Sequence, residues 1–197
     1  MNKVLIRHAQ SPNQPVARER SVILNSLTSR GIGEMERPKA VLKKLEELGD
    51  LDIYTRAIAV PDNTWSKLSA LLLKYTFEEV QEATTSGGTS ALEGLFNFRV
   101  EPRLEEPDTT LTPRELNTTL KRGEVASEAM QAASRLITPP VPEEDIWIVG
   151  EQIMAAVCVT VGEGQHRPLL PSSSLLGRKP TEASLLAGHG EARLVTL

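Results

Sequence analysis

The segment Lys3-Val4-Leu5-Ile6-Arg7-His8, near the first residue of the sequence, gives the clearest indication of the fold. Its short, continuous apolar run predicts a buried strand in a sheet that is covered on both faces. Arg7 and His8 follow where this strand ends. Because ligands bind at the carboxyl ends of strands in open α/β sheets, we expect these two side chains to lie at a binding site.

Strands and helices alternate through the rest of the sequence. Asp145-Ile146-Trp147-Ile148-Val149 is the strongest candidate for a central strand, and an apolar helix follows it. The alternation predicts one α/β domain over residues 1–197, with a mainly parallel central sheet between two helical layers. The expected strands are 3–6, 51–54, 95–100 and 145–149, with two more around the Gly-His-Gly turn of the tail; the expected helices are 28–48 (broken near Pro38), 64–75, 124–137 and 151–161; the expected loops are 84–94, 101–114 and 163–181.

Composition and charge exclude several classes of protein. The 197 residues include 22 Lys and Arg against 26 Asp and Glu, so a broad basic face for nucleic acid is not expected. The single Cys158 excludes a disulfide scaffold and a thiolate zinc cluster. No apolar run reaches the roughly 18 residues of a membrane span, and the first residues do not form a signal peptide. We therefore expect a cytoplasmic protein with a small-molecule substrate and with no nucleic-acid or membrane partner; the oligomeric state stays open.

The heptapeptide Leu5-Ile6-Arg7-His8-Ala9-Gln10-Ser11 resembles the Arg-His-Gly signature of the histidine phosphatase (phosphoglycerate mutase-like) superfamily. Weaker similarities follow in the family's order at 27–31, 52–64, 103–106 and 123–124. The resemblance implies a phosphoglycerate mutase-like fold. It also implies a phosphomonoester hydrolase, or a related phosphoryl-transfer enzyme, that forms a phosphohistidine and uses no metal or organic cofactor.

The same resemblance suggests a role for each residue that matches a motif. His8 would be the nucleophile and Arg7 a ligand of the phosphoryl oxygens. Glu106 would donate a proton to the leaving group, with Glu105 as the alternative one position away. Two further residues would line the phosphate pocket: Ser11 and Gln14, the latter where the family usually has Asn.

Two positions depart from the family pattern. An ungapped alignment of 52–64 places Val60 at the family's second arginine, so Arg56 could fill this role only through a shortened loop. Glu151 follows the last parallel strand, where the family has its second histidine. His189 in the segment AGHGE mimics the missing motif, but too few residues follow it for the family's last elements. We therefore expect Glu151 at the pocket and His189 in a hairpin turn.

These departures shift the charge of the predicted pocket toward negative. One unit charge pair at about 4 Å is worth about 4 kcal/mol at an effective dielectric constant of 20. The loss of one arginine and the exchange of a histidine for a glutamate could therefore remove most of the affinity for a phosphate dianion. A second hypothesis is therefore a degenerate family member whose pocket is non-catalytic or serves other chemistry. His8, Glu106 and Glu151 could also form a metal site with one histidine and two carboxylates.

Overall fold

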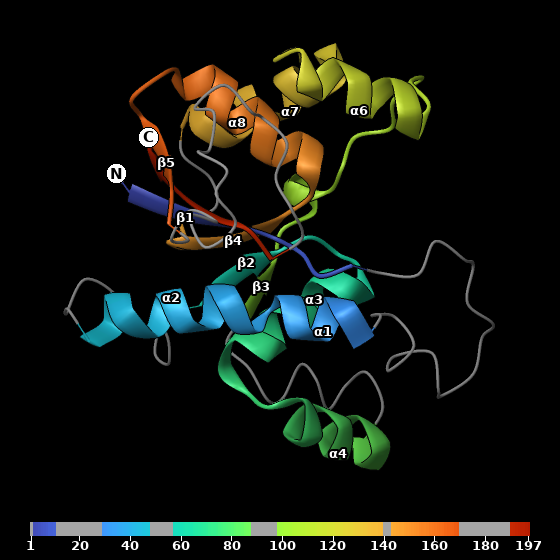
Figure 1. The fold of residues 1–197 in the computed structure, drawn as a ribbon, viewed down its shortest axis with the longest axis vertical. Helices are drawn as coiled ribbons and strands as arrows, with labels where there is room; N and C mark the ends of the chain where they lie inside the picture. Colours follow the sequence, from blue (N-terminus) through green and yellow to red (C-terminus); the bar gives the residue numbers. More distant parts are fainter. Residues whose placement is uncertain (1, 11–28, 48–56, 88–97, 140–142, 170–189) are drawn as a thin grey trace, which may run out of the picture.

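The computed structural model describes residues 2–10, 29–47, 57–87, 98–139, 143–169 and 190–197. A central sheet lies between two layers of helices (Figure 1). The strands are β1 (Asn2–Arg7), β2 (Ile58–Val60), β3 (Phe98–Val100), β4 (Ile146–Val149), β5 (His166–Pro168) and β6 (Ala192–Thr196). The helices are α1 (Ser29–Glu34), α2 (Glu36–Glu47), α3 (Thr64–Lys74), α4 (Phe77–Gly87), η3 (Pro102–Leu104, a 3-10 turn), α6 (Pro113–Lys121), α7 (Ser127–Ile137) and α8 (Glu151–Val161).

The six described strands form one sheet in the order β3-β2-β4-β1-β6-β5. The first four strands in this order are mutually parallel, and β6 pairs antiparallel with both β1 and β5. The predicted α/β class with a mainly parallel sheet is therefore confirmed. The parallel strands end at the same edge of the sheet, and this edge carries the site described below.

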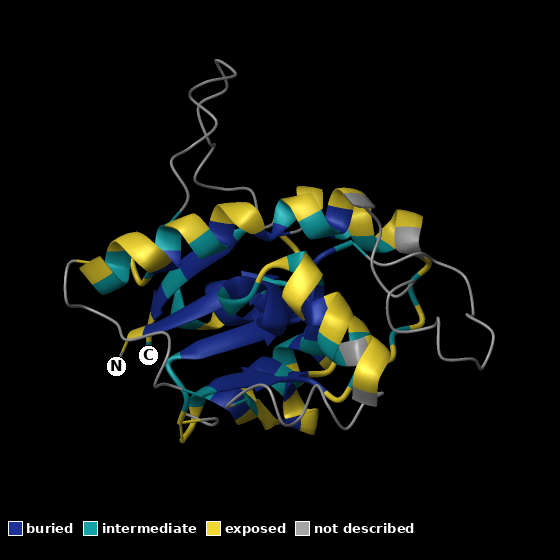
Figure 2. Cartoon of the chain, turned by 90° about the horizontal axis from the view of Figure 1, so that it is seen from below, coloured by how far each residue is buried: buried dark blue, intermediate teal, exposed yellow. Residues whose placement is uncertain are grey.

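The central strands of the sheet are buried between the helical layers (Figure 2), and both of its faces pack against hydrophobic cores. Along β1, Val4 and Ile6 face one hydrophobic core while Leu5 faces the other, because successive side chains of a strand alternate between faces. Along β4, Ile146 and Ile148 share the first core, and Trp147 and Val149 share the second. Each such buried aliphatic side chain contributes roughly 1.5–3 kcal/mol to folding.

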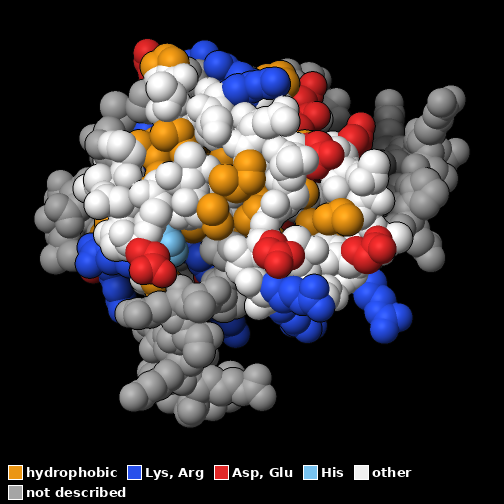
Figure 3. Space-filling view, turned by 90° about the horizontal axis from the view of Figure 1, so that it is seen from above, with side chains coloured by type: hydrophobic (Ala, Val, Ile, Leu, Met, Phe, Trp, Pro, Cys, Tyr) orange, Lys and Arg blue, Asp and Glu red, His pale blue; other side chains and the backbone are white. Residues whose placement is uncertain are grey.

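Each core is closed by its own set of helices. Helices α2, α3 and α4 cover the first core, and α7 and α8 cover the second. Helix α6 packs on α8 through a smaller cluster that contains Leu120 and the buried Cys158. The outer face of the α6–α8 layer carries apolar side chains among charged ones (Figure 3), and Val159 of α8 is exposed there. None of the helices in the described part of the chain is long and apolar enough to cross a lipid bilayer.

The second strand differs from the sequence prediction. The structure places β2 at Ile58–Val60, with all three residues buried, whereas the strand predicted at 51–54 lies outside the described residues. A further strand, β5, lies within the predicted loop 163–181. It ends in Pro168, which an edge strand tolerates because its outer side forms no ladder.

Two helices also extend into predicted loops. Helix α4 continues to Gly87, and the hydroxyls of Thr85 and Ser86 donate to carbonyls one turn earlier. Helix α6 begins within the predicted loop 101–114, at Pro113. The expected helix break lies at Met35, between α1 and α2, so that Pro38 falls in the first turn of α2, where proline is tolerated.

Candidate functional site

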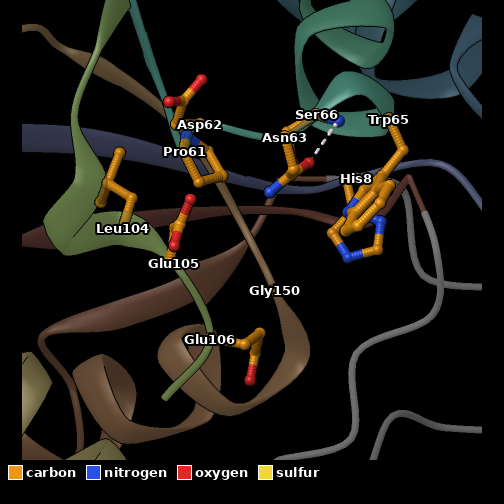
Figure 4. Close-up of a pocket in the computed structure, with 10 residues that line it drawn as sticks. All are labelled: His8, Pro61, Asp62, Asn63, Trp65, Ser66, Leu104, Glu105, Glu106 and Gly150. Carbon is orange, nitrogen blue, oxygen red and sulfur yellow. Dashed lines mark hydrogen bonds between the residues drawn. The ribbon is translucent and has the colours of Figure 1, made fainter. Parts of the chain in front are cut away.

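A cavity of about 430 Å³ opens at the carboxyl ends of β1, β2 and β4 (Figure 4). Its wall combines one imidazole, one indole ring, three carboxyl side chains and several neutral groups. None of the described lining residues is Lys or Arg. The lining residues are His8, Pro61, Asp62, Asn63, Trp65, Ser66, Leu104, Glu105, Glu106 and Gly150.

His8 follows the last residue of β1, and its backbone N–H donates to the carbonyl of Val149 at the end of β4 (3.1 Å). Its ring atom Nδ1 lies 2.9 Å from the carbonyl oxygen of Ala9. A carbonyl oxygen only accepts, so Nδ1 carries the ring proton and Nε2 of the neutral imidazole carries the lone pair. The backbone next to His8 thus selects the tautomer in which Nε2 is the nucleophilic atom.

Ala9, whose carbonyl accepts from the His8 ring, is itself hydrogen-bonded to helix α3. The Ala9 N–H donates to the hydroxyl of Ser69 (2.9 Å), and this hydroxyl donates to the carbonyl of Trp65 (2.7 Å). Ser69 is fully buried, and its bond from the Ala9 N–H is shielded from water. The Trp65 ring stands beside the His8 ring, with centroids 6.5 Å apart and planes inclined by 59°.

The loop after β3 brings Glu106 to the same cavity. Glu101 precedes the 3-10 turn and accepts from Arg103 at Nε and Nη2, each at 2.7 Å, which lowers the pKa of its carboxyl. Leu104 is buried in the second core and anchors the turn. Glu105 and Glu106 follow this anchor and extend into the cavity from the β3 side (Figure 4).

The carboxyl group of Glu106 turns toward the first residues of α8, where its Oε1 accepts from the Gln152 N–H (2.9 Å). Although the residue as a whole is exposed, the carboxyl end is enclosed against the helix. Desolvation of this end raises the pKa of Glu106 to about 7; bonds from the Gln152 and Ile153 N–H groups oppose the shift, and the charge of Glu151 adds to it. Near neutral pH, Glu106 can therefore donate a proton and take one back.

This position of Glu106 requires glycine at residue 150. A Cβ atom built on Gly150 would lie 1.8 Å from Oε1 of Glu106 and 2.4 Å from its Cγ. Gly150 also precedes α8 as its N-cap, in extended conformation. The sequence Gly150-Glu151 thus ends β4, begins α8 and leaves room for the acid.

Arg7 and Glu151 form an ion pair at the edge of the site, with Nη2 of Arg7 3.1 Å from Oε2 of Glu151. Both side chains are partly buried. Burial raises the pKa of Glu151, the charge of Arg7 counteracts this, and Glu191 adds to the rise. The Arg7 guanidinium is thus paired with a carboxylate of the protein, Glu151.

The end of β2 contributes residues that the sequence reasoning did not single out. Asn63 is the N-cap of α3, because its Oδ1 accepts from the Ser66 N–H (2.9 Å). The Asn63 amide therefore presents its Nδ2 donors away from the helix, on the cavity side (Figure 4). An N-capping Asn after the apolar run Ile58–Val60 and Pro61 was a usable signal for this turn.

The predicted site residues divide into two groups. Arg7, His8, Glu106 and Glu151 lie around the ends of β1, β3 and β4; of these four, His8 and Glu106 line the cavity, and the Arg7–Glu151 pair lies at its edge. Val60, which the ungapped alignment puts at the family's second arginine, is buried within β2. Four predicted or alternative residues lie outside the described part of the chain: Ser11, Gln14, Arg56 and His189.

The metal hypothesis finds no support in the arrangement of ligands. Among the described residues, no three or more His, Cys, Asp or Glu side chains are grouped so that they could hold a metal ion. This includes His8, Glu106 and Glu151. His166 lies on edge strand β5 and does not line the cavity; desolvation and then Arg193 lower its pKa.

Comparison with known proteins finds phosphatases among solved structures of similar fold. One match is the alpha-ribazole phosphatase of Shigella flexneri, at 14% identity and TM-score 0.48, over 100% of this chain and 91% of that one. Others are a mycobacterial glucosyl-3-phosphoglycerate phosphatase (14%, TM-score 0.45, 99% and 90%) and the phosphoserine phosphatase of Entamoeba histolytica (14%, TM-score 0.44, 98% and 89%). No family model and no curated protein sequence matches the chain. These identities and TM-scores assign no role to any residue of this chain.

Proposed function

We propose that this chain is a phosphomonoester hydrolase that acts through a phosphohistidine on Nε2 of His8. One observation carries the proposal: a histidine whose Nδ1 is committed to the Ala9 carbonyl shares a cavity with Glu106, whose pKa is about 7. A nucleophile with a fixed lone pair and an acid poised near neutral pH are the two groups that phosphoryl transfer to histidine requires.

The reaction runs in two half-steps. The Nε2 lone pair attacks phosphorus, a P–N bond forms, the ester P–O bond breaks, and the leaving alkoxide takes the proton of Glu106. A water molecule then gives a proton to the Glu106 carboxylate and attacks the phosphohistidine. The P–N bond breaks, inorganic phosphate leaves, and His8 and Glu106 return to their starting states.

The phosphoryl group requires electrostatic stabilisation, and the described residues offer three sources. These are the Nδ2 donors of Asn63, the N-terminal end of α3 that Asn63 caps, and the guanidinium of Arg7. Arg7 is paired with Glu151, so a phosphate must compete with this carboxylate for the guanidinium. We therefore expect weaker phosphate binding than in a site whose arginines face the substrate alone.

The alternative is a degenerate member of the phosphatase fold that binds a small molecule and does not hydrolyse it. The Arg7–Glu151 pair favours this alternative, as do the carboxyl groups of Glu105 and Glu106 in the cavity wall. The third carboxyl group of the wall, Asp62, is paired with Lys67 (2.6 Å). In that case His8 would serve as a hydrogen-bonding group in a pocket for a neutral or cationic ligand.

Hydrolysis of p-nitrophenyl phosphate between pH 4 and 8 tests the proposal. We expect turnover in the wild type, its loss in His8→Ala, and unchanged turnover in His166→Ala, which removes an imidazole remote from the cavity. Acid quenching of a reaction with labelled phosphoester should trap a phosphohistidine in the wild type only. If the wild type neither turns over the ester nor binds orthovanadate, the proposal fails and the binding alternative stands.

A further inference from the structure

The peptide group between Ala9 and Gln10 connects His8 to a carboxylate on the neighbouring helix. Its carbonyl oxygen accepts from Nδ1 of His8 at 2.9 Å. Its N–H, on Gln10, donates to Oε2 of Glu34 at 3.3 Å. The same amide thus lies between an imidazole N–H and a carboxylate, and each of its polar ends has a partner.

A second contact holds this segment from the other side. The Ala9 N–H donates to the hydroxyl of Ser69, which is fully buried in α3. Helix α1 therefore holds the segment through Glu34, and helix α3 holds it through Ser69. We call these two contacts the Ala9 clamp.

We propose that the Ala9 clamp is a positioning device for the nucleophile: Glu34 and Ser69 fix the orientation and tautomer of the His8 ring through the Ala9 backbone, and the Glu34 charge increases the basicity of Nε2. This inference rests on the proposed function, because it assigns to both residues a role in the reactivity of His8. Neither side chain lines the cavity.

The physical argument is one of polarisation. A carboxylate that accepts from an amide N–H increases the negative partial charge on the carbonyl oxygen of the same amide. That oxygen then forms a stronger hydrogen bond with Nδ1–H and stabilises a positively charged ring. The arrangement resembles a carboxylate–histidine pair with one peptide group inserted between the partners.

The surroundings of Glu34 fit this role. Arg30, one turn earlier on α1, lies with Nε 3.0 Å from Oε1 of Glu34, and its own side chain is 80% exposed. One carboxylate oxygen therefore contacts a solvated cation, while the other contacts the Gln10 N–H. The side chain of Glu34 itself is only 15% exposed, so its interaction with the amide is partly shielded from solvent.

Other charged groups around His8 act from different directions. Asp62, Glu105 and Glu106 line the same cavity, with Asp62 paired to Lys67 and the Glu106 carboxyl turned toward α8. The Arg7–Glu151 pair lies at the ends of β1 and β4. The test therefore changes the clamp residues alone and follows the ring directly rather than through activity.

Nitrogen-15 NMR of the two ring nitrogens of His8 provides this direct readout. Their signals are assigned by their loss in His8→Ala. We expect the Nδ1–H tautomer in the wild type. Glu34→Gln keeps an acceptor for the Gln10 N–H but removes the charge, so it should retain the tautomer and lower the titration midpoint of His8. Its kcat on p-nitrophenyl phosphate should fall roughly two- to tenfold with little change in KM. Ser69→Ala should populate both tautomers.

Matched controls separate positioning from general stability. Glu47→Gln removes an exposed carboxylate from α2, and Ser134→Ala removes a hydroxyl that donates to the Met130 carbonyl (2.9 Å) on remote α7. Neither should affect His8. If Ser69→Ala does not fold, Glu34→Gln still decides the question. An unchanged tautomer and midpoint of His8 in the folded clamp variants would overturn the proposal even when the wild type is an active phosphatase. If the clamp variants change the tautomer or the titration midpoint of His8 but the wild type is inactive as a phosphatase, the clamp is supported and only the proposed function is rejected.

Discussion

Replacement of Gly150 by alanine probes the contact between β4, α8 and the proposed acid. The new Cβ would lie within 2.4 Å of Oε1, Cδ and Cγ of Glu106. These atoms belong to the end of a flexible side chain, so we expect Glu106 to leave its position while the backbone stays in place. The carboxyl group would move into water and lose its bond from Gln152.

The effect on activity should exceed the effect on stability. With the pKa of Glu106 at about 7, about half of the carboxyl groups are protonated at pH 7; at the ordinary value of 4.5, about one in 300 would be. If kcat follows the protonated fraction, it falls ~150-fold at pH 7. Loss of one hydrogen bond and of a glycine cap costs only about 2 kcal/mol of unfolding free energy.

The pH dependence of kcat, together with urea unfolding followed by circular dichroism, measures both quantities. Gly33→Ala is the matched control, because a Cβ at this exposed position in α1 meets nothing within 4 Å. It should leave kcat unchanged and should stabilise the helix by about 0.5–1 kcal/mol. If Gly150→Ala keeps kcat within about twofold of the wild type at pH 7, Glu106 does not act as the acid from this position.

Three further predictions concern the charges. In the wild type, kcat should fall as pH rises through about 7, because Glu106 then loses the proton that it donates to the leaving group. The raised pKa of Glu106 also means that the wild type loses stability as pH rises from about 4.5 to about 7. Glu106→Gln should show neither this fall in kcat nor this loss of stability. Glu151→Gln should tighten orthovanadate binding, measured by calorimetry, by about tenfold, because the Glu151 carboxylate then no longer competes for Arg7; weaker or equal binding would contradict this. Lys3→Met should lower the unfolding free energy by about 3 kcal/mol, because the buried Nζ donates to the carbonyls of Glu143 and Glu144; a variant as stable as the wild type would show that this network is dispensable.

The two central strands could be predicted from sequence because each predicted segment, of four or five residues, contains a continuous apolar run. The runs at 3–6 and 145–149 are continuous and apolar, and the structure places them side by side at the centre of the sheet. The run Ile58–Val60 is only three residues long and was masked by the similarity of 52–64 to a family motif. Its identity as a strand depends on pairing with β3 and β4, which a local pattern does not reveal.

Helix α6 had a local signal that the surrounding prolines obscured. Thr112 and Glu115 form a capping box, and Pro113 occupies the first helical turn, where its missing N–H costs nothing. The proline-rich composition of 101–114 predicted a loop throughout. The spacing of Thr112 and Glu115 was the better guide to the beginning of α6.

The site shows a similar division. The resemblance at the end of β1 predicted Arg7 and His8 as site residues, and the resemblance around Leu104 predicted Glu106, with Glu105 as the alternative. Asn63 had a local N-cap signal that the sequence reasoning did not use. Ser69 remained hidden because its role arises from the packing of α3 against the β1 end, across about 60 residues of sequence. Contacts of this kind are set by tertiary structure and leave no periodicity in the chain.

The contrast between the two tryptophans gives the protein a pair of intrinsic fluorophores. Trp147 is fully enclosed in the sheet, so its emission should respond to unfolding and stay insensitive to added ligand. Trp65 is 39% exposed on the cavity wall beside an imidazole, so its emission should be quenched or shifted when the cavity fills. Single Trp→Phe variants would separate the two signals and allow screening of ligands by titration without a label.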